Sequence, residues 1–215
     1  MTKLLISRLN YLEPNGTTDV TRTVFLGDKS RISAYQKECF TRVLKGHIQL
    51  SSRIFPSGIK SELLDSFARQ SLWQAGLDYR HGTGHGVGAL LNVHEMPIIG
   101  NRRSSEIVVE ENMIVTIEPG YYEDGNFGIR IENCVLTVKA NTKYKYAANV
   151  EFVRFEPLTY VPLQRELIDL SLLTSDELDW INEYHEKCLS LIGEQLKSAG
   201  KARVYEWLVE QTKPL

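Results

Sequence analysis

The glycine- and histidine-rich segment 80–100 constrains the fold of this chain most strongly. It contains His81, His85 and His94, three of the five histidines in the sequence, together with Pro97, and glycine occupies every second position from 82 to 88. Glycine and proline disfavour a regular helix, and closely spaced glycines let backbone approach an imidazole or a ligand. We therefore predict loops and short strands here, with room beside the imidazoles for a ligand. A glycine-rich structural turn is an equal alternative.

The rest of the chain divides into segments with strand character and segments with helical periodicity. Residues of alternating polarity, or short apolar runs between turn residues, indicate strands at 17–26, 113–118, 127–138 and 149–155. Apolar residues spaced three and four apart indicate helices at 33–50, at 61–75 and after a capping box at Thr174 and Glu177. Strands and helices do not alternate regularly, which favours an α+β domain with an antiparallel or mixed sheet.

Composition bounds the class of protein and its partners. The 215 residues, 42% hydrophobic and 24% charged, suffice for one soluble globular domain, or one domain with an appendage. A net charge of -2 without a long basic run argues against a nucleic-acid partner. The first residues are too polar for a secretory signal or a membrane anchor, and the three cysteines are widely spaced. We therefore expect a cytoplasmic protein with reduced thiols and no membrane contact.

Carboxylates stand inside or at the end of otherwise apolar strands. Asp19 lies among β-branched residues, Glu118 ends an apolar run, and Glu132 shares one strand face with Arg130. Burying a carboxylate is costly unless it is paired or bound to a metal. The alternatives are an exposed strand face on which Asp19 neighbours Arg22, and a surface ion pair between Arg130 and Glu132.

An imidazole completes this set of candidate ligands. His81 and His85 are four residues apart, but the glycines between them exclude the helical HExxH zinc motif. Asp19, His85, Glu118 and Glu132 together offer carboxylate oxygens and one imidazole, which suits Mn²⁺, Co²⁺, Fe²⁺ or Zn²⁺. No GxGxxG or GxxxxGK[ST] motif stands at a strand-to-helix junction, so a flavin or nucleotide enzyme fits poorly.

Five ordered motifs resemble one family of enzymes. In chain order they are GTTDVTRT, HGTGHGVG, NVHEMP, TIEPGYYEDG and GIRIEN. They resemble the catalytic domain of the Xaa-Pro aminopeptidases (aminopeptidase P), most closely the cytosolic eukaryotic members. The resemblance implies an α+β fold: an incomplete pita-bread domain, as in creatinase and methionine aminopeptidase, with a curved, mostly antiparallel sheet flanked by helices. It also implies that 1–164 is the C-terminal part of this catalytic domain and 165–215 a helical extension of it.

The same resemblance implies a metal site. The family holds two divalent ions, commonly manganese, with two Asp, one His and two Glu. Matching motif by motif assigns Asp19 and Glu132 as bridging ligands, and His85 and Glu118 as ligands of one ion. The implied reaction is release of an N-terminal residue that precedes proline, by a metal-activated water, with Glu118 a candidate for proton transfer.

Three further residues are implied to be catalytic and to bind substrate. His81, His94 and Arg130 match family positions that hold the peptide or stabilise the reaction intermediate. The expected substrates are peptides with proline at the second position. The C-terminal helices contribute dimer contacts in the family, so we expect a homodimer.

The chain departs from the family pattern in two respects. Ile6 falls where the family places its other metal-binding aspartate, and Arg8 replaces a glycine in the same strand. The first half of the family's catalytic domain, with a further active-site histidine, has no counterpart in these residues. We therefore expect that one metal ion can be retained and that this chain in isolation hydrolyses little. The alternative is a non-catalytic remnant or truncated isoform that acts as a binding or dimerisation module.

Overall fold

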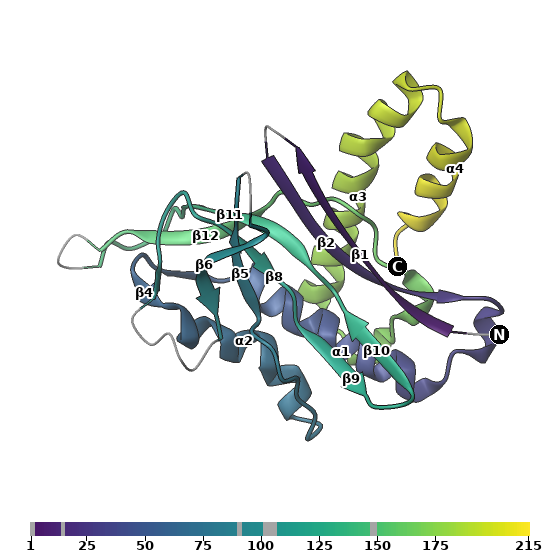
Figure 1. Ribbon diagram of the computed structural model, residues 1–215, viewed down its shortest axis with the longest axis horizontal. Helices are drawn as coiled ribbons and strands as arrows, with labels where there is room; N and C mark the ends of the chain where they lie inside the picture. The colour runs from purple at the N-terminus through teal and green to yellow at the C-terminus, as the bar shows by residue number, and fades with distance from the viewer. Residues whose placement is uncertain (1–2, 14–15, 90–91, 101–106, 147–149) are drawn as a thin grey trace.

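The computed structural model describes residues 3–13, 16–89, 92–100, 107–146 and 150–215 (Figure 1). The strands are β1 (Lys3–Glu13), β2 (Gly16–Leu26), β3 (Ile54–Pro56), β4 (Ile59–Lys60), β5 (Gly84–Val87), β6 (His94–Ile99), β7 (Val108–Val109), β8 (Ile114–Ile117), β9 (Gly120–Glu123), β10 (Phe127–Arg130), β11 (Asn133–Lys139) and β12 (Phe152–Pro157). The α-helices are α1 (Ala34–Ser51), α2 (Ser61–Trp73), α3 (Ser175–Ser198) and α4 (Ala202–Gln211). Short 3-10 turns are η1 (Lys29–Arg31), η2 (Arg165–Leu167) and η3 (Leu170–Leu172). Within these residues no helix is long and apolar enough to cross a membrane.

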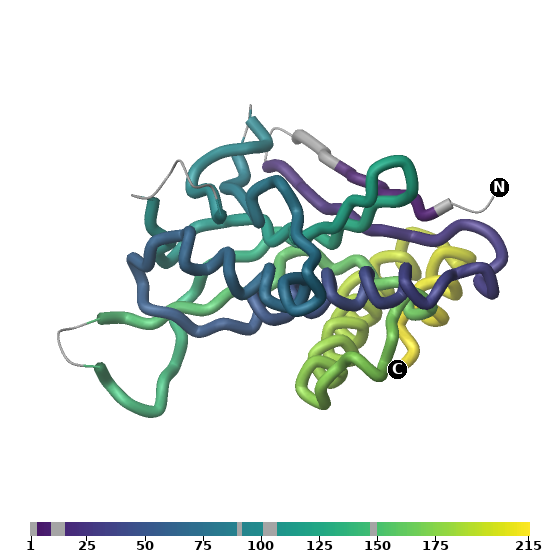
Figure 2. The backbone as a smooth tube through the Cα atoms, turned by 90° about the horizontal axis from the view of Figure 1, so that it is seen from below, coloured from purple at the N-terminus to yellow at the C-terminus, as the bar shows by residue number. Residues whose placement is uncertain are grey.

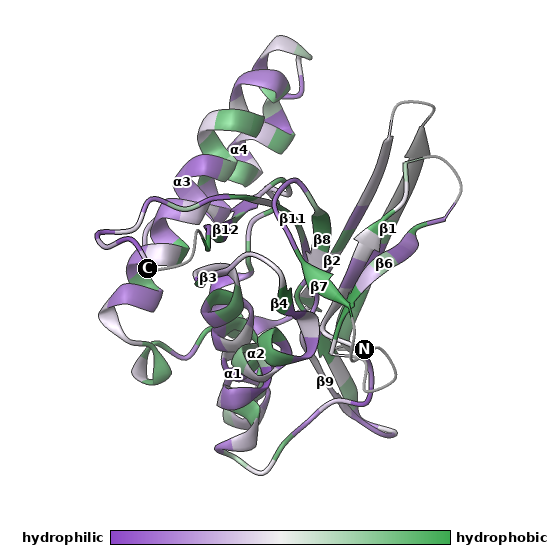
Figure 3. Cartoon of the chain, turned by 90° about the vertical axis from the view of Figure 1, so that its left-hand side faces the viewer, coloured by the Kyte–Doolittle hydropathy of each residue, from purple (hydrophilic) through white to green (hydrophobic). Residues whose placement is uncertain are grey.

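Antiparallel pairing builds the sheet on which the rest of the fold is assembled. Among the described strands, six form one sheet in the order β3-β12-β11-β8-β5-β6, and β9–β10 and β4–β7 form short separate pairs. The β1–β2 hairpin pairs from Lys3 opposite Leu26 to Glu13 opposite Gly16. A β-bridge between Thr21 and Glu132 helps to connect the hairpin to the remaining strands. Figure 3 shows the helices on one side of the molecule and the hairpin on the other. The predicted α+β class with a mostly antiparallel sheet is confirmed.

Two buried apolar clusters hold the helices in place. One joins α1 to β10 and to the C-terminal helices, with Phe40 and Ile181 among its fully buried side chains. The other lies between α2 and the central sheet, with Leu64 and Val115 at 0% exposure. Figure 2 shows the C-terminal helices lying beside α1. Because each cluster removes large aliphatic and aromatic side chains from water, hydrophobic burial is what fixes the helices against the sheet.

The helices predicted at 33–50 and 61–75 are confirmed as α1 and α2. The predicted capping box is also confirmed: the Thr174 side chain accepts from the Glu177 N–H, and the Glu177 side chain accepts from the Thr174 N–H. The C-terminal helical segment, however, is divided into α3 and α4. Gly200 lies between them at φ +65, a left-handed conformation that glycine adopts without steric cost and that ends a helix.

The strands predicted at 17–26 and 113–118 are confirmed as β2 and β8, and the last predicted strand is present as β12. Residues 147–149, within or next to the predicted range 149–155, lie outside the described residues. A continuous strand over 127–138 is wrong. The Ile131 N–H donates to Pro119 O and the Glu132 N–H donates to Thr21 O, so the chain changes partners between β10 and β11.

Candidate metal centre

Asp19, His85, Glu118 and Glu132 come from separate elements and meet at one buried point. Asp19 lies in β2 and His85 in β5, whereas Glu118 follows β8 and Glu132 lies between β10 and β11. None of the four is more than 8% exposed. His85 Nε2 lies 3.5 Å from Asp19 Oδ2 and 3.3 Å from Glu118 Oε1. Ligand atoms of His85, Glu118 and Glu132 all lie within 4.8 Å of one another.

The alternatives for the carboxylates are therefore wrong. Asp19 is 0% exposed and is not on a solvated strand face, and Glu132, also 0% exposed, cannot form a surface pair with Arg130. Arg22 points away from the cluster and into the core: its guanidinium donates to Val161 O, to Glu132 O and to the Tyr184 hydroxyl. Arg22 thus holds the backbone of Glu132, not the carboxylate of Asp19.

Glycines on both sides of His85 allow the neighbouring backbones to close around its strand. A Cβ at Gly84 would lie 1.9 Å from Thr116 O, and a Cβ at Gly86 would lie 2.1 Å from Met96 O. The His85 N–H also donates to Thr116 Oγ1 at 3.1 Å. Larger residues would push β8 and β6 away, so alternate glycines are needed to seat this imidazole within the sheet.

Hydrogen bonding determines which nitrogen of His85 faces the carboxylates. His85 Nδ1 lies 2.8 Å from Gly86 O, an acceptor, so Nδ1 carries the proton in the neutral ring. Burial lowers the pKa of His85, which keeps the ring neutral at physiological pH. The Nε2 lone pair is then directed at Asp19 and Glu118. This is the tautomer that metal-ligating histidines adopt.

The electrostatics of the cluster call for a cation. Burial first, and then the charge of Glu118, raise the pKa of Glu132 to about 8, and burial also raises the pKa of Glu118. Thr21 Oγ1 donates to Glu132 Oε2. Across the described part of the chain, no hydrogen-bond partner is found for His85 Nε2 or Glu132 Oε1, both of which are buried. Buried polar atoms without partners are costly, whereas a divalent cation between His85 Nε2 and an ionised Glu132 would satisfy both. The residues present fit a metal ion.

His81 and Arg130 are linked beside the cluster by Tyr122, which the sequence reasoning did not single out. The Tyr122 hydroxyl lies 2.9 Å from His81 Nε2, and Arg130 Nε donates to it at 2.7 Å. Arg130 Nη1 also lies 3.8 Å from Glu118 Oε2. Burial lowers the pKa of His81 to about 4, so its ring is neutral at pH 7. Tyr122 stands in the TIEPGYYEDG motif, two residues after Gly120. Residues two apart in a strand lie on the same face, and this spacing was the only indication that the sequence offered.

His94 lies on the hairpin side of the cluster. Its ring centroid is 4.3 Å from that of His85, in an edge-to-face arrangement. Its Nε2 lies 2.9 Å from Arg8 Nη2, and Arg8 in turn donates from Nη2 to Asp19 Oδ2 at 3.0 Å. In the sequence, Arg8 stands out only because it occupies a position where the family pattern has a glycine. Because Arg8 pairs opposite Thr21, two residues from Asp19 in β2, the hairpin register is what brings the guanidinium to the carboxylate.

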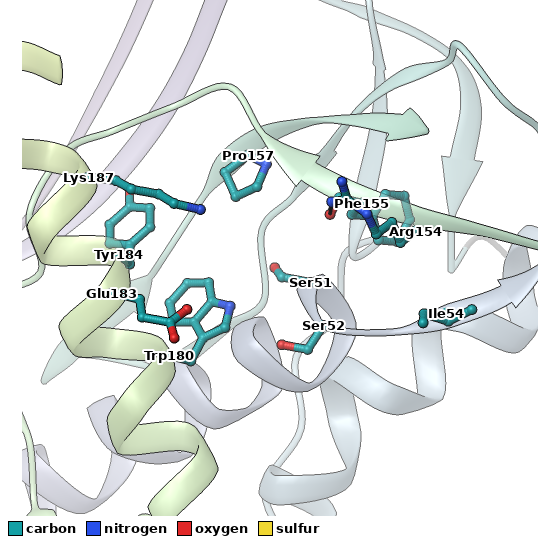
Figure 4. A pocket seen from close by; sticks show the side chains of 10 residues that line it. All are labelled: Ser51, Ser52, Ile54, Arg154, Phe155, Pro157, Trp180, Glu183, Tyr184 and Lys187. Atoms are coloured by element: carbon teal, nitrogen blue, oxygen red, sulfur yellow. Dashed lines mark hydrogen bonds between the residues drawn. The ribbon is translucent and has the colours of Figure 1, made fainter. Parts of the chain in front are cut away.

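Some cavities of the structure are lined by His81, and another lies away from all the predicted site residues. A cavity of about 830 Å³ is lined by residues of α2 and by Tyr79, His81 and Ile98, among others. A smaller one of about 300 Å³ includes His81 and Tyr122. The pocket in Figure 4, about 310 Å³, lies between α3, β12 and the end of α1, and none of its lining residues is a predicted site residue. None of the candidate metal ligands lines these cavities, and His81 is the residue through which the first two approach the site.

The sequence of this chain matches models of a known family. A family model described as Metallopeptidase family M24 matches residues 10–139, and one described as the C-terminal region of peptidase_M24 matches residues 151–215. The chain belongs to metallopeptidase family M24, and the resemblance seen in its motifs is confirmed.

Its relatives within the family carry aminopeptidase names. Aminopeptidase P1 of Lotus japonicus is 46% identical over 212 residues, covering 99% of this chain and 31% of the plant protein. Xaa-Pro aminopeptidase 2 of Homo sapiens is 45% identical over 201 residues, covering 94% of this chain and 28% of the human protein. The X-prolyl aminopeptidase of Caenorhabditis elegans, described as a cytosolic enzyme with a di-nuclear active site, matches with a TM-score of 0.88 and 44% identity. That match covers 100% of this chain and 34% of the other, and it confirms the pita-bread fold class. The chain thus spans about a third of the length of these relatives.

Proposed function

We propose that this chain forms a metal-dependent active site of the Xaa-Pro aminopeptidase type, which releases an N-terminal residue that precedes proline. The observation that carries the proposal is the buried meeting of His85, Glu118 and Glu132, in which two polar atoms lack hydrogen-bond partners within the described residues. The names of the relatives support the substrate class, a peptide with proline at its second position.

In this proposal His85, Glu118 and Glu132 hold a divalent cation, and Asp19 closes the site on the hairpin side. A carboxylate-rich set with one imidazole suits Mn²⁺, which we propose as the resident ion. When bound, such an ion supplies Lewis acidity toward a water molecule and toward the scissile carbonyl. The description of the Caenorhabditis elegans relative as having a di-nuclear active site supports a metal-dependent active site in this chain.

The remaining site residues position the peptide and manage charge and protons. The pKa of Glu118 is raised by burial, so its carboxyl can take up and return a proton closer to neutral pH than an exposed carboxyl can. The Arg130 Nε–H donates to the Tyr122 hydroxyl, which orients the guanidinium toward an oxyanion that develops beside Glu118. His81, neutral at pH 7, and His94 contact the substrate in this proposal, and the bonds of their Nε2 atoms to Tyr122 and Arg8 orient the two rings. The cavity of about 300 Å³ lined by His81 and Tyr122 offers space for part of the peptide.

We further propose a cytoplasmic protein that forms a homodimer through its C-terminal helices. Leu191 in α3 and Val204 and Trp207 in α4 are each at least 46% exposed, and a second copy would cover them. Light scattering on the purified chain tests this, with Trp207→Ser as the variant expected to shift the mass toward the monomer. A monomeric mass for the unmodified chain would contradict it.

Metal analysis and peptide cleavage on the same purified protein test the central proposal. After dialysis against Mn²⁺, the chain should retain the ion and cleave an Xaa-Pro-Xaa peptide, at a rate far below that of a full-length relative measured alongside. Glu132→Gln should lose the ion, whereas Glu206→Gln, a change of the same type at an exposed position of α4, should keep it. A chain that retains no Mn²⁺ would overturn the proposed metal site.

One observation favours the second candidate, a non-catalytic binding or dimerisation module. Arg8 pairs with Asp19, so one of the carboxylates expected to serve a metal already has a cationic partner. Retained Mn²⁺ together with no cleavage of the peptide, even at high enzyme concentration, would support this candidate over the enzyme.

A further inference from the structure

Two groups of metal-ligating atoms share His85 in this centre. Asp19, His85 and His94 form one group, and His85, Glu118 and Glu132 form the other, each with its atoms within 4.8 Å of one another. The first group extends into the β1–β2 hairpin and the second to the end of β8 and the β10–β11 junction, with His85 Nε2 3.5 Å from Asp19 Oδ2 and 3.3 Å from Glu118 Oε1. In geometry alone, each group could accept a positive charge.

The Arg8 guanidinium fills the first group. Arg8 Nη2 donates to Asp19 Oδ2 at 3.0 Å, and Nε lies 3.4 Å from Asp19 Oδ1. The same Nη2 lies 2.9 Å from His94 Nε2. Because a guanidinium only donates, His94 Nε2 must accept with its lone pair, which is then not free for a metal. Both side chains that accompany His85 in this group are therefore engaged by one cation.

The side chain of Ile6, also in β1, has no atom that can bind a metal. Ile6 lies two residues before Arg8 and so on the same face of the strand. A Cβ on Gly128 would lie 2.9 Å from Ile6 Cδ1, so this apolar side chain packs over the backbone of β10. From β1, the centre thus receives an aliphatic contact and a fixed positive charge in place of a carboxylate.

Charge balance agrees with a single divalent ion. When ionised, Asp19, Glu118 and Glu132 carry three negative charges, which one divalent ion and the Arg8 guanidinium neutralise. Arg130 adds a positive charge 3.8 Å from Glu118, at a side chain that is 21% exposed. A second divalent ion would leave a buried excess of positive charge beside Arg8, which low-dielectric surroundings penalise.

We infer that Arg8 is a built-in cation that takes the place of one of two metal ions, so that the centre holds a single divalent ion on His85, Glu118 and Glu132. This inference rests on the proposed metal site. It makes Arg8 a positioning residue: the guanidinium holds the Asp19 carboxylate and the His94 ring, and it contributes to the net charge seen by the ion. The pairing does not depend on metal supply, because a guanidinium stays protonated at all physiological pH values.

Counting bound Mn²⁺ tests the inference without relying on activity. The chain and its variants are equilibrated with Mn²⁺, and the ions per chain are measured by plasma mass spectrometry. Electron paramagnetic resonance of the same samples distinguishes an isolated Mn²⁺ from a magnetically coupled pair. The unmodified chain and Arg8→Lys, which retains a positive charge, should each hold one isolated ion. Ile6→Asp combined with Arg8→Gly should hold two ions with a coupled spectrum, while Arg203→Ala, at an exposed site in α4, should match the unmodified chain.

The outcomes separate this inference from the proposed function beneath it. Two coupled ions in the unmodified chain, or a single ion in the folded double variant, would overturn the role of Arg8 and leave the metal site standing. No ion in the unmodified chain and none in the double variant would overturn the metal site itself. Circular dichroism of each variant tests whether it is folded. Should the double variant fail to fold, Arg8→Gly alone provides a milder change. This single variant should bind a second Mn²⁺ ion, more weakly than the first.

Discussion

Glu132 gives the stability of the metal-free chain a pH dependence opposite to that of an ion-paired carboxylate. Burial, and then the charge of Glu118, raise the pKa of Glu132 to about 8, compared with an ordinary value of 4.5 in the unfolded chain. Between these values the folded chain holds a proton that the unfolded chain has released. The free energy of unfolding therefore falls as pH rises, by up to about 1.4 kcal/mol per pH unit. From pH 5 to pH 8 the loss is roughly 3 kcal/mol.

Glu132→Gln removes this titration while nearly preserving the shape of the side chain. Urea denaturation of both proteins in EDTA, at intervals from pH 5 to pH 8, gives the difference between their free energies of unfolding. That difference should change by roughly 3 kcal/mol in favour of the variant as pH rises. Burial lowers the pKa values of His47, His81 and His185, which makes stability rise with pH, but both proteins contain these histidines and their contribution cancels.

Adding Mn²⁺ at pH 8 completes the test. The ion should raise the free energy of unfolding of the unmodified chain, because it binds only the folded centre, and should have little effect on Glu132→Gln. If the difference between the two proteins stays constant from pH 5 to pH 8, Glu132 is ionised in the metal-free fold and the reasoning from its burial is refuted. Equal stabilisation of both proteins by Mn²⁺ would place the ion elsewhere.

Three further changes have outcomes that follow from the packing. Gly84→Ala should lower the free energy of unfolding by about 2 kcal/mol or more and weaken Mn²⁺ retention, because the new Cβ would lie 1.9 Å from Thr116 O. Arg22→Ala should destabilise the chain by about 3 kcal/mol in urea denaturation, because it leaves buried carbonyl groups and a tyrosine hydroxyl without their donor. Tyr122→Phe should lower kcat/KM for an Xaa-Pro-Xaa peptide by about tenfold with little change in stability, because it unlinks the histidine and the arginine that flank the centre.

Each of these changes has a matched control. Gly193→Ala in α3 meets only the Tyr205 side chain at 3.2 Å, with nothing else nearer than 3.5 Å, so it should be neutral or stabilising. Arg203→Ala and Tyr146→Phe alter exposed side chains and should leave stability and kcat/KM unchanged. A Gly84→Ala protein as stable as the unmodified chain would contradict the close approach of β8 to β5. Full activity in Tyr122→Phe would remove that hydroxyl from the proposed positioning of Arg130.

Local patterns in the sequence predict the helices and several of the strands. The helical periodicity at 33–50 and the capping box at Thr174 depend on residues within a few positions of one another, and both are present as expected. The break between β10 and β11 is different. The Glu132 N–H donates to Thr21 O, more than a hundred residues earlier in the chain, and no local pattern contains that partner.

The candidate site divides in the same way. The motifs singled out Asp19, His85, Glu118 and Glu132 as candidate ligands, and the structure brings these four together; their roles stay predictions. Arg8 was noted only as a departure from the family pattern. Its contact with Asp19 depends on the register of the hairpin, which a turn of uncertain length between the two strands leaves open in the sequence.

The sequence by itself determined the residue types, the strand and helix tendencies, and the alternation of glycines around His85. Tertiary structure decided which of the polar side chains are removed from water, and therefore which acceptors lack donors and which carboxylates hold protons. These properties arise because burial and charge act between side chains brought close by folding, whatever their distance along the chain. The guanidinium of Arg8 acquires its place beside Asp19 and His94 only when β1, β2 and β6 have assembled.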